Sequence, residues 1–340
     1  MGRTFNVAVV GATGVVGEAM LSILESRRFP IDRIHAVASR RSAGQKVRFG
    51  DRELVVEDLD QFDFTGIDIG LFSPGASVSA VHAPRAAAAG CIVIDNTSQF
   101  RYDADIPLVV PEVNPQAVAL YRNRHIIANP NCSTIQMVVA LKPIYDAAGI
   151  ERINVCTYQS VSGTGREAVE ELQQQTVALL NGRSAEASVY PKQIAFNALP
   201  HIDVFQDNGY TKEEMKMVWE TRKILGDESI QVNATCVRIP VFYGHSEAVH
   251  VETRRKIGVE EVRDLLRRQP GVELMDERRD GGYPTAVTEA SGRDPVYVGR
   301  IREDISHPRG IDLWVVADNV RKGAALNSVQ IAEILVKDYL

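Results

Sequence analysis

One cysteine, Cys132, occupies a position where its thiol could act as a nucleophile. It follows a short apolar run and an Asn-Pro-Asn turn, and it precedes the apolar stretch 135–141, which predicts a buried helix. Unpaired backbone N–H groups and the helix dipole favour an anion at a helix N-terminus, so a thiol there has a lowered pKa and is partly thiolate near neutral pH. The alternative is that Asn131 or Ser133 caps the helix and Cys132 is a small core residue. The nucleophile is favoured because the rest of the chain supplies what a cysteine-based reaction needs.

A glycine-rich loop near the N-terminus predicts a dinucleotide site. The apolar strand 5–10 runs directly into the loop 11–17, Gly-Ala-Thr-Gly-Val-Val-Gly, and a helical pattern follows. Gly11 permits the tight turn, Gly14 lets backbone N–H groups approach a pyrophosphate, and Gly17 allows close packing of helix on strand. A glycine triplet alone is a weak signal, but the order strand, glycine turn, helix favours dinucleotide binding. The predicted cofactor contacts in this loop are Gly11, Thr13, Gly14, Val15 and Val16.

The turn after the second predicted strand, 34–38, indicates which dinucleotide binds. A site that prefers NAD usually carries an acidic residue near this point, which holds the ribose 2′-hydroxyl. This chain has Ser39-Arg40-Arg41-Ser42 instead, and guanidinium groups suit a 2′-phosphate. NADP is therefore favoured over NAD, with Arg41 and Ser42 as contacts, and a solvated surface turn is the alternative. Ser73 follows another buried strand and could touch the cofactor, although an ordinary strand-to-helix turn explains it almost as well.

Two single residues could also take part in chemistry, each with a structural alternative. Arg101 stands in a polar loop after a strand end, among hydrogen-bonding groups and without an obvious helical partner. A phosphate ligand would suit this arginine, and a plain surface arginine is equally consistent with the spacing. His245 follows a glycine where a strand begins, a place from which an imidazole can project into a cleft. A lone histidine is nevertheless more often structural than catalytic.

A charged pair lies on a helix that has a clear start signal. Thr211 and Glu214 fit a capping box, in which a threonine begins the helix and a glutamate three residues later bonds back to it. Glu213 and Lys216 lie three residues apart in this helix, so they share a face. On spacing alone, a surface salt bridge is the better explanation of the pair.

The composition and the order of elements indicate a two-domain α/β protein. The 340 residues suffice for two domains and a large core. Up to Cys132 buried strands alternate with helices, whereas the longer strand 152–161 alternates in polarity as expected for a sheet with one covered face. Apolar residues recur at helical spacing from about residue 324 to the end, which predicts a docking helix. Residues 181–195 read as an irregular loop.

The bulk properties exclude several classes of protein. A hydrophobic fraction of 45% and a charged fraction of 24% are ordinary for a globular protein. The net charge of −6 and the lack of a basic block argue against nucleic-acid binding, and no apolar run is long enough to span a membrane. The N-terminus leads into a strand, not a cleavable signal peptide, and four cysteines do not make a disulfide framework. We therefore expect a cytoplasmic location, and no metal-ligand spacing is present.

Taken together, the motifs resemble the aspartate-β-semialdehyde dehydrogenase family over nearly the whole chain. The set is specific because several motifs occur in the expected order, and no functional position departs from the family pattern. The resemblance is closest to the bacterial form with a compact glycine turn. The matching segments are 11–17, Asn129–Thr134, Gln159 with Ser162–Gly165, Glu213–Lys216, Arg238–Pro240 and Gly244-His245.

The resemblance implies a role for each of these residues. Cys132 is the nucleophile that carries an acyl-thioester, and His245 is the acid–base catalyst. Gln159 orients the substrate, Arg238 grips its α-carboxylate and Glu213 faces its ammonium group. The remaining implied contacts are Arg101 and Lys216 to the phosphate, Asn131 to the substrate, and Ser162, Gly163 and Asn319 to the cofactor.

The resemblance also implies a fold and an activity. The expected fold is a Rossmann-type NADP-binding domain, 1–131, completed by a C-terminal helix, 320–340, and an α+β catalytic and dimerisation domain, 132–319, with a largely mixed sheet. The expected reaction is NADPH-dependent reductive dephosphorylation of 4-phospho-L-aspartate to L-aspartate 4-semialdehyde by a homodimer. This reaction belongs to the biosynthesis of lysine and diaminopimelate, threonine, methionine and isoleucine. The expected small-molecule partners are the substrate and phosphate.

Two alternatives are weighed against this activity. An N-acetyl-glutamyl-phosphate reductase binds a substrate whose acetylated nitrogen carries no charge and needs no carboxylate partner. Glu213 together with Arg238 therefore favours a free amino acid, an argument that borrows from the resemblance. A non-catalytic dimeric relative should lack the thiol or the imidazole, whereas this chain has both Cys132 and His245.

Overall fold

The computed structural model describes residues 3–340, and the chain divides into two compact units. One unit comprises Met1–Asn131 with Ala324–Leu340, and the other comprises Cys132–Gly323. The predicted return to the first unit, at residue 320, lies before the return in the structure because Gly323 still packs against Cys132: a Cβ added at Gly323 would lie 2.7 Å from the Cys132 Cβ. Within residues 3–340, no helix combines the length and apolar character that crossing a bilayer requires.

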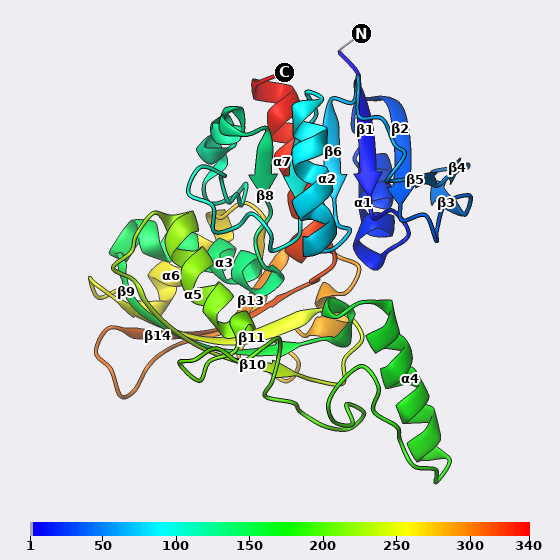
Figure 1. Ribbon diagram of the computed structural model, residues 1–340. Coiled ribbons are helices and arrows are strands. Elements are labelled where there is room, and N and C mark those ends of the chain that lie inside the picture. Colours follow the sequence, from blue (N-terminus) through cyan, green and yellow to red (C-terminus); the bar gives the residue numbers. More distant parts are fainter. Residues whose placement is uncertain (1–2) are drawn as a thin grey trace. The chain divides into compact units, whose positions relative to one another are not determined.

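A six-stranded parallel sheet in the order β5-β2-β1-β6-β7-β8 forms the centre of the first unit (Figure 1). Because β1 lies between β2 and β6, the strand order reverses beside it, which is where open α/β sheets bind ligands. The sequence pattern does not predict the short, half-exposed strands β3, β4 and β5. The strands are β1 (Phe5–Val10), β2 (Ile31–Ala38), β5 (Glu57–Asp58), β6 (Ile69–Phe72), β7 (Ile92–Asp95) and β8 (Ile126–Ala128), with the hairpin β3 (Lys46–Phe49) and β4 (Arg52–Val55).

Helices cover this parallel sheet. The helices are α1 (Val15–Ser26), α2 (Ala76–Ala88), η1 (Pro115–Asn123) and α7 (Leu326–Asp338). Helices α1 and α7 share one hydrophobic core with β1, in which Met20, Val329 and Leu335 are fully buried. The predicted C-terminal stripe is therefore confirmed as a docking face, because it completes the core of the N-terminal unit.

A mixed six-stranded sheet in the order β10-β9-β11-β14-β13-β12 forms the second unit. Its central strand begins at His245, earlier than the predicted start at residue 250. The prediction is wrong there because residues 245–247 are polar, yet they are buried and paired with a strand on each side. The strands are β9 (Ile150–Gln159), β10 (Gln231–Arg238), β11 (His245–Thr253), β12 (Val272–Leu274), β13 (Val296–Glu303) and β14 (Gly310–Ala317).

Three helices, α3 (Cys132–Ala148), α5 (Lys212–Leu225) and α6 (Val259–Arg268), pack against this mixed sheet. The sheet side chains that alternate with the buried ones are partly exposed, among them Tyr158 and Trp314, whose ring centroids lie 5.6 Å apart. Helix α4 (Arg166–Leu180) extends away from the sheet after the short turn η2 (Val161–Gly163) (Figure 1). The region predicted as an irregular loop, 181–195, contains neither helix nor strand. The remaining short helical turns are η3 (Ala286–Ala290) and η4 (Arg321–Ala325).

Candidate active site

Cys132 is the first residue of α3 and lies half-buried outside any disulfide. The predicted place at a helix N-terminus is confirmed, although the helix begins two residues earlier than its pattern indicates. The structure thus gives the thiol the position in which a helix favours an anion. The glycine of the returning chain, Gly323, lies against Cys132 and leaves no room for a side chain.

His245 is fully buried at the start of β11, and its ring has a defined orientation. Its Nδ1 accepts a hydrogen bond of 3.1 Å from the backbone N–H of Ser160, so a neutral ring must carry its proton on Nε2. Within residues 3–340, Nε2 has no hydrogen-bond partner. Burial, and then the charge of Arg238, lower the pKa of His245 to about 3. The imidazole is therefore neutral near pH 7 and presents an N–H donor.

Asn319 holds the turn that contacts this histidine. Its Oδ1 accepts hydrogen bonds from the backbone N–H of Gly244 at 2.9 Å and from the hydroxyl of Ser160 at 3.0 Å. Its amide nitrogen donates to the hydroxyl of Ser162 at 3.0 Å. Asn319 and Ser162, predicted cofactor contacts, are both almost fully buried. In this structure they join the end of β9 to the residue that precedes His245.

Arg238, at the end of β10, points a buried guanidinium toward the same turn. Its Nη1 donates to the carbonyl of Ser160 at 2.7 Å, and its buried Nε has no partner among the residues that the structure describes. A Cβ added at Gly163 would lie 3.0 Å from Arg238 Nη1 and 3.5 Å from His245 Nε2. Arg238 and His245 therefore converge on a small space that only a glycine leaves open.

The predicted substrate residues Gln159, Glu213 and Lys216 form one buried network. Gln159 donates to Glu213 at 3.2 Å, and Lys216 pairs with Glu213 and with Asp203, each at 2.8 Å. Burial opposes the charge of Lys216, but the two carboxylates outweigh it and raise the pKa of Lys216 above its ordinary value. The alternative of a surface salt bridge is wrong, because the side chains of Glu213 and Lys216 are only 7% and 12% exposed.

The helix that carries this pair begins as predicted. The hydroxyl of Thr211 accepts from the N–H of Glu214 at 3.3 Å, and the Glu214 carboxylate accepts from the N–H of Thr211 at 2.8 Å. This reciprocal pair of bonds confirms the capping box. It fixes the first turn of α5, where Glu213 lies.

The predicted cofactor residues of the first unit surround a cavity of about 390 Å³. Gly11 has a φ of +88°, and a Cβ there would lie 2.6 Å from the carbonyl oxygen of Ser73, so glycine is required at this turn. Val15 and Val16 are not among the lining residues, because they begin α1 and Val16 packs on the core. The lining residues include Gly11, Thr13, Gly14, Ser39, Arg41, Ser42, Asp60, Ser73 and His82.

This cavity fits a dinucleotide with a 2′-phosphate. The glycine loop leaves the N-terminus of α1 accessible, and Arg41 with two serines lies at the end of β2. Asp60, which also lines the cavity, lies 3.4 Å from His82. Arg41 supplies the cation that a 2′-phosphate needs.

Arg101 and Asn131 belong to the first unit, where both are almost fully buried. The guanidinium of Arg101 donates to the carbonyls of Thr97 at 3.1 Å and of Asn96 at 2.8 Å. The alternative of a solvated surface arginine is therefore wrong. The structure fixes the Arg101 side chain against its own loop.

Two residues of the site escape prediction. Ser160 orients His245 through its backbone N–H, and Asp203 pairs with Lys216 from a loop without regular structure. A backbone donor has no sequence signature, and the position of Asp203 depends on a left-handed backbone conformation with a φ of +67°. Only its proximity to Gln159 in the chain points to Ser160.

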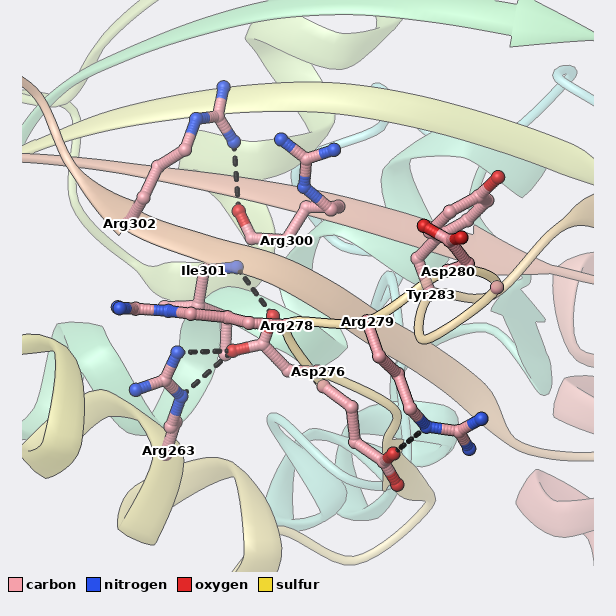
Figure 2. Close-up of a pocket in the computed structure, with 11 residues that line it drawn as sticks. Arg263, Asp276, Arg278, Arg279, Asp280, Tyr283, Arg300, Ile301 and Arg302 are labelled. Atoms are coloured by element: carbon pink, nitrogen blue, oxygen red, sulfur yellow. Dashed lines mark hydrogen bonds and ion pairs between the residues drawn. The ribbon is translucent and has the colours of Figure 1, made fainter.

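A separate cavity of about 690 Å³ lies in the second unit and includes none of the predicted site residues (Figure 2). It has five arginines, but its one buried cation, Arg263, is neutralised by Asp276 at 2.7 Å and by Glu260. The other four arginines are exposed. This cavity is a charged surface basin without a buried, unsatisfied polar group. Within residues 3–340, no cluster of three His, Cys, Asp or Glu side chains could hold a metal ion.

Comparison with known proteins agrees with this arrangement. Residues 6–121 match the model of the semialdehyde dehydrogenase NAD binding domain, and residues 141–322 match that of the semialdehyde dehydrogenase dimerisation domain. The fold and the site thus define an oxidoreductase of the semialdehyde dehydrogenase class.

Full-length relatives narrow this class. The chain is 63% identical over 339 residues to the aspartate-semialdehyde dehydrogenase of Shewanella violacea, with 100% of each chain covered. A crystal structure of aspartate semialdehyde dehydrogenase II from Vibrio cholerae, complexed with ASA, matches with a TM-score of 0.98, 62% identity and full coverage of both chains. The enzyme from Candida albicans with NADP matches with a TM-score of 0.77 and 28% identity over 98% of each chain. The chain belongs to the aspartate-semialdehyde dehydrogenase family.

Proposed function

We propose that the chain catalyses the NADPH-dependent conversion of 4-phospho-L-aspartate to L-aspartate 4-semialdehyde and phosphate, and the reverse reaction. One observation carries the proposal: the buried nitrogens of Arg238 and His245 converge on Gly163, in the unit whose helix α3 begins with Cys132. The reaction supplies precursors of lysine and diaminopimelate, threonine, methionine and isoleucine.

In this proposal Cys132 forms the covalent intermediate. Its thiolate attacks the acyl carbon, the carbon–sulfur bond forms, and the bond to the phosphate oxygen breaks, which leaves an acyl-thioester and free phosphate. The Nε2–H of His245 donates a hydrogen bond to the oxygen that becomes negative in the tetrahedral intermediate. After reduction of the thioester, the thiohemiacetal collapses to the aldehyde and the thiolate returns.

The charged residues select an amino acid with a phosphorylated side chain. Arg238 binds the α-carboxylate with a guanidinium that is already desolvated, and Glu213 faces the ammonium group. Lys216 and Arg101 bind the phosphate. Gln159, held by Glu213, orients the acyl group. A substrate with an acetylated nitrogen would leave the buried Glu213 without a cationic ligand, so N-acetyl-glutamyl phosphate is disfavoured.

The first unit would hold NADPH, which when bound supplies the hydride. The backbone around Gly11 and Gly14 would hold the pyrophosphate at the start of α1, and Arg41 with Ser42 the 2′-phosphate. We place the enzyme in the cytoplasm because its chemistry requires a reduced thiol, and none of its four cysteines forms a disulfide.

The proposal includes a homodimer built through the second unit. Residues 141–322 match a dimerisation domain, and the partly exposed aromatic pair of Tyr158 and Trp314 lies on the mixed sheet of that unit. Replacing Trp314 with glutamate should shift the chain from dimer to monomer in sedimentation experiments. A mass unchanged by this substitution would place the interface elsewhere.

Trapping of the thioester tests the catalytic proposal. The chain is incubated with 4-phospho-L-aspartate and no reductant, and its peptides are analysed by mass spectrometry. We expect an aspartyl adduct on the Cys132 peptide, absent from Cys132→Ser and retained in Cys156→Ser, the half-buried control. Turnover of Cys132→Ser within about tenfold of the parent would refute the covalent role. Assays of both aldehydes side by side decide between the free and the acetylated substrate.

A further inference from the structure

Glu247 is a fully buried carboxyl group between the residues of the candidate site, and the proposed reaction leaves it unused. It lies on β11 two residues after His245, so both side chains face the same side of the sheet. In the strand register it is opposite Thr157 of β9 and Val315 of β14, both fully buried. The carboxyl group therefore lies within the packed interior of the second unit.

The polar neighbours of Glu247 come from the start of α3. The side chains of Ser133, directly after Cys132, and of Gln136, one turn later, are close enough to favour the ionised carboxyl. The amide nitrogen of Gln136 also donates long hydrogen bonds to the carbonyls of His245 at 3.5 Å and of Val315 at 3.4 Å. Glu247 and Gln136 thus link the helix that carries Cys132 to the strand that carries His245.

Glu247 has no compensating positive charge. No lysine, arginine or histidine of residues 3–340 forms an ion pair with it, and burial outweighs Gln136 and Ser133, which raises the pKa of Glu247 well above its ordinary value. A buried carboxyl without a cation takes up a proton and stays neutral. A protonated carboxyl can donate one hydrogen bond and accept another, whereas a carboxylate can only accept.

The other titratable groups around it would also oppose ionisation. These are Cys132 at the start of α3, His245 on the same strand, Cys236 on β10 and Glu213 on α5. Burial raises the pKa of the Cys236 thiol, with Glu213 and Glu247 adding to the shift, so Cys236 is neutral. His245 is also neutral near pH 7. A negative charge on Glu247 would therefore act unscreened on the Cys132 thiolate and oppose its formation.

We propose that Glu247 is a positioning residue that works as a neutral carboxylic acid, bonding the first turn of α3 to β11 and keeping negative charge away from Cys132. This inference deepens the proposed dehydrogenase reaction and rests on it for the role of Cys132. The protonation of Glu247 and the reactivity of the thiol can be measured without dehydrogenase activity.

Two substitutions of similar volume separate hydrogen bonding from packing. Glu247→Gln keeps the hydrogen-bonding groups and fixes a neutral state, whereas Glu247→Leu fills the space with apolar atoms. We expect kcat of Glu247→Gln to stay close to that of the parent and kcat of Glu247→Leu to fall by about a hundredfold, with KM little changed, because a displaced nucleophile is slow. Thermal unfolding verifies that both variants fold.

Two further readouts make the test independent of turnover. The infrared difference spectrum between the parent and Glu247→Gln at neutral pH should contain the C=O stretch of a protonated carboxyl. In a Cys156→Ser background, the pH midpoint of iodoacetamide alkylation at Cys132 should be the same for Glu and Gln at position 247 and shifted for Leu.

The outcomes decide the proposal even if one variant fails to fold. A carboxylate band in place of the carboxylic acid band overturns it, and so does a Glu247→Gln variant that loses as much activity as Glu247→Leu. If the infrared and alkylation results agree with the proposal but no variant reduces the acyl phosphate, then the proposed function fails and the protonated state of Glu247 stands.

Discussion

Gly163 is the residue whose replacement reports most directly on the site. An alanine Cβ there would lie 3.0 Å from Arg238 Nη1 and 3.5 Å from His245 Nε2, the two groups proposed to bind the carboxylate and the oxyanion. We expect Gly163→Ala to raise KM for the aldehyde and to lower kcat by about a hundredfold, because small displacements of catalytic groups are costly. Steady-state kinetics checks this result.

A matched control exists for that substitution. Gly258→Ala adds the same methyl group at the start of α6, where φ is −88° and no atom lies within 4 Å of the new Cβ. Its kinetics should equal those of the parent. Equal losses in both variants would show that Gly163 has no special relation to the site.

His245 should make the unfolding free energy depend on pH. Its pKa in the folded chain is lowered to about 3 from 6.5, by burial first and by Arg238 second. Above pH 6.5 the ring is neutral in both states, but below it the unfolded chain binds a proton that the folded chain does not, so the unfolding free energy falls as the pH falls toward 3. In His245→Gln, urea unfolding should fall less steeply between about pH 7 and about pH 5. Parallel slopes for parent and variant would contradict the shift.

At the scale of elements, the capping box of α5 should matter for substrate binding. Thr211→Ala removes the acceptor for the N–H of Glu214 and should lower the free energy of unfolding by about 1 kcal/mol. Because Glu213 lies in this first turn, KM for the aldehyde should rise while KM for NADP stays the same. Thr211→Ser, which retains the hydroxyl, is the control. An unchanged KM for the aldehyde in the alanine variant would separate the cap from the site.

The elements that pattern alone predicts are those with a regular apolar period. The glycine loop with α1, the helix that begins at Cys132, the capping box and the C-terminal stripe all have the predicted type. The start of β11 is hidden because His245, Ser246 and Glu247 are polar residues in a buried strand, and polarity normally indicates exposure. Burial of these three residues depends on neighbouring strands β9 and β14, which are distant in the sequence.

The site residues divide in the same way. Cys132 and the glycine loop have local signatures, whereas the convergence of Arg238, His245 and Gly163 needs β10, β11 and the η2 turn to meet. From spacing alone, Glu213 and Lys216 read as a surface pair, because nothing in a helix pattern reveals that Asp203 and Gln159 cover them. Family resemblance identified these residues where local physics could not.

At the scale of the whole molecule, the last helix should control the stability of the nucleotide-binding unit. Leu335 of α7 is fully buried in the core that α1 and β1 share, so Leu335→Ala should lower the free energy of unfolding by about 2–5 kcal/mol. Because the chain forms two units, this loss should appear mainly in the N-terminal unit and weaken NADP binding on heating. Differential scanning calorimetry with and without NADP checks it.

The control for this prediction lies on the exposed side of the same helix. Lys337→Ala removes an exposed side chain and should leave the thermal transition in place. If Leu335→Ala melts like Lys337→Ala, the C-terminal helix contributes little to the first unit.

The hydrogen bond from Ser160 to Nδ1 of His245 has a consequence for the source of hydrogen ions during turnover. With Nδ1 occupied as an acceptor, the imidazole begins each cycle with its hydrogen already on the opposite nitrogen. Stabilising the first oxyanion then requires no uptake from water, only a shift along an existing hydrogen bond. Formation of the thioester should accordingly proceed at nearly the same rate in deuterium oxide as in ordinary water.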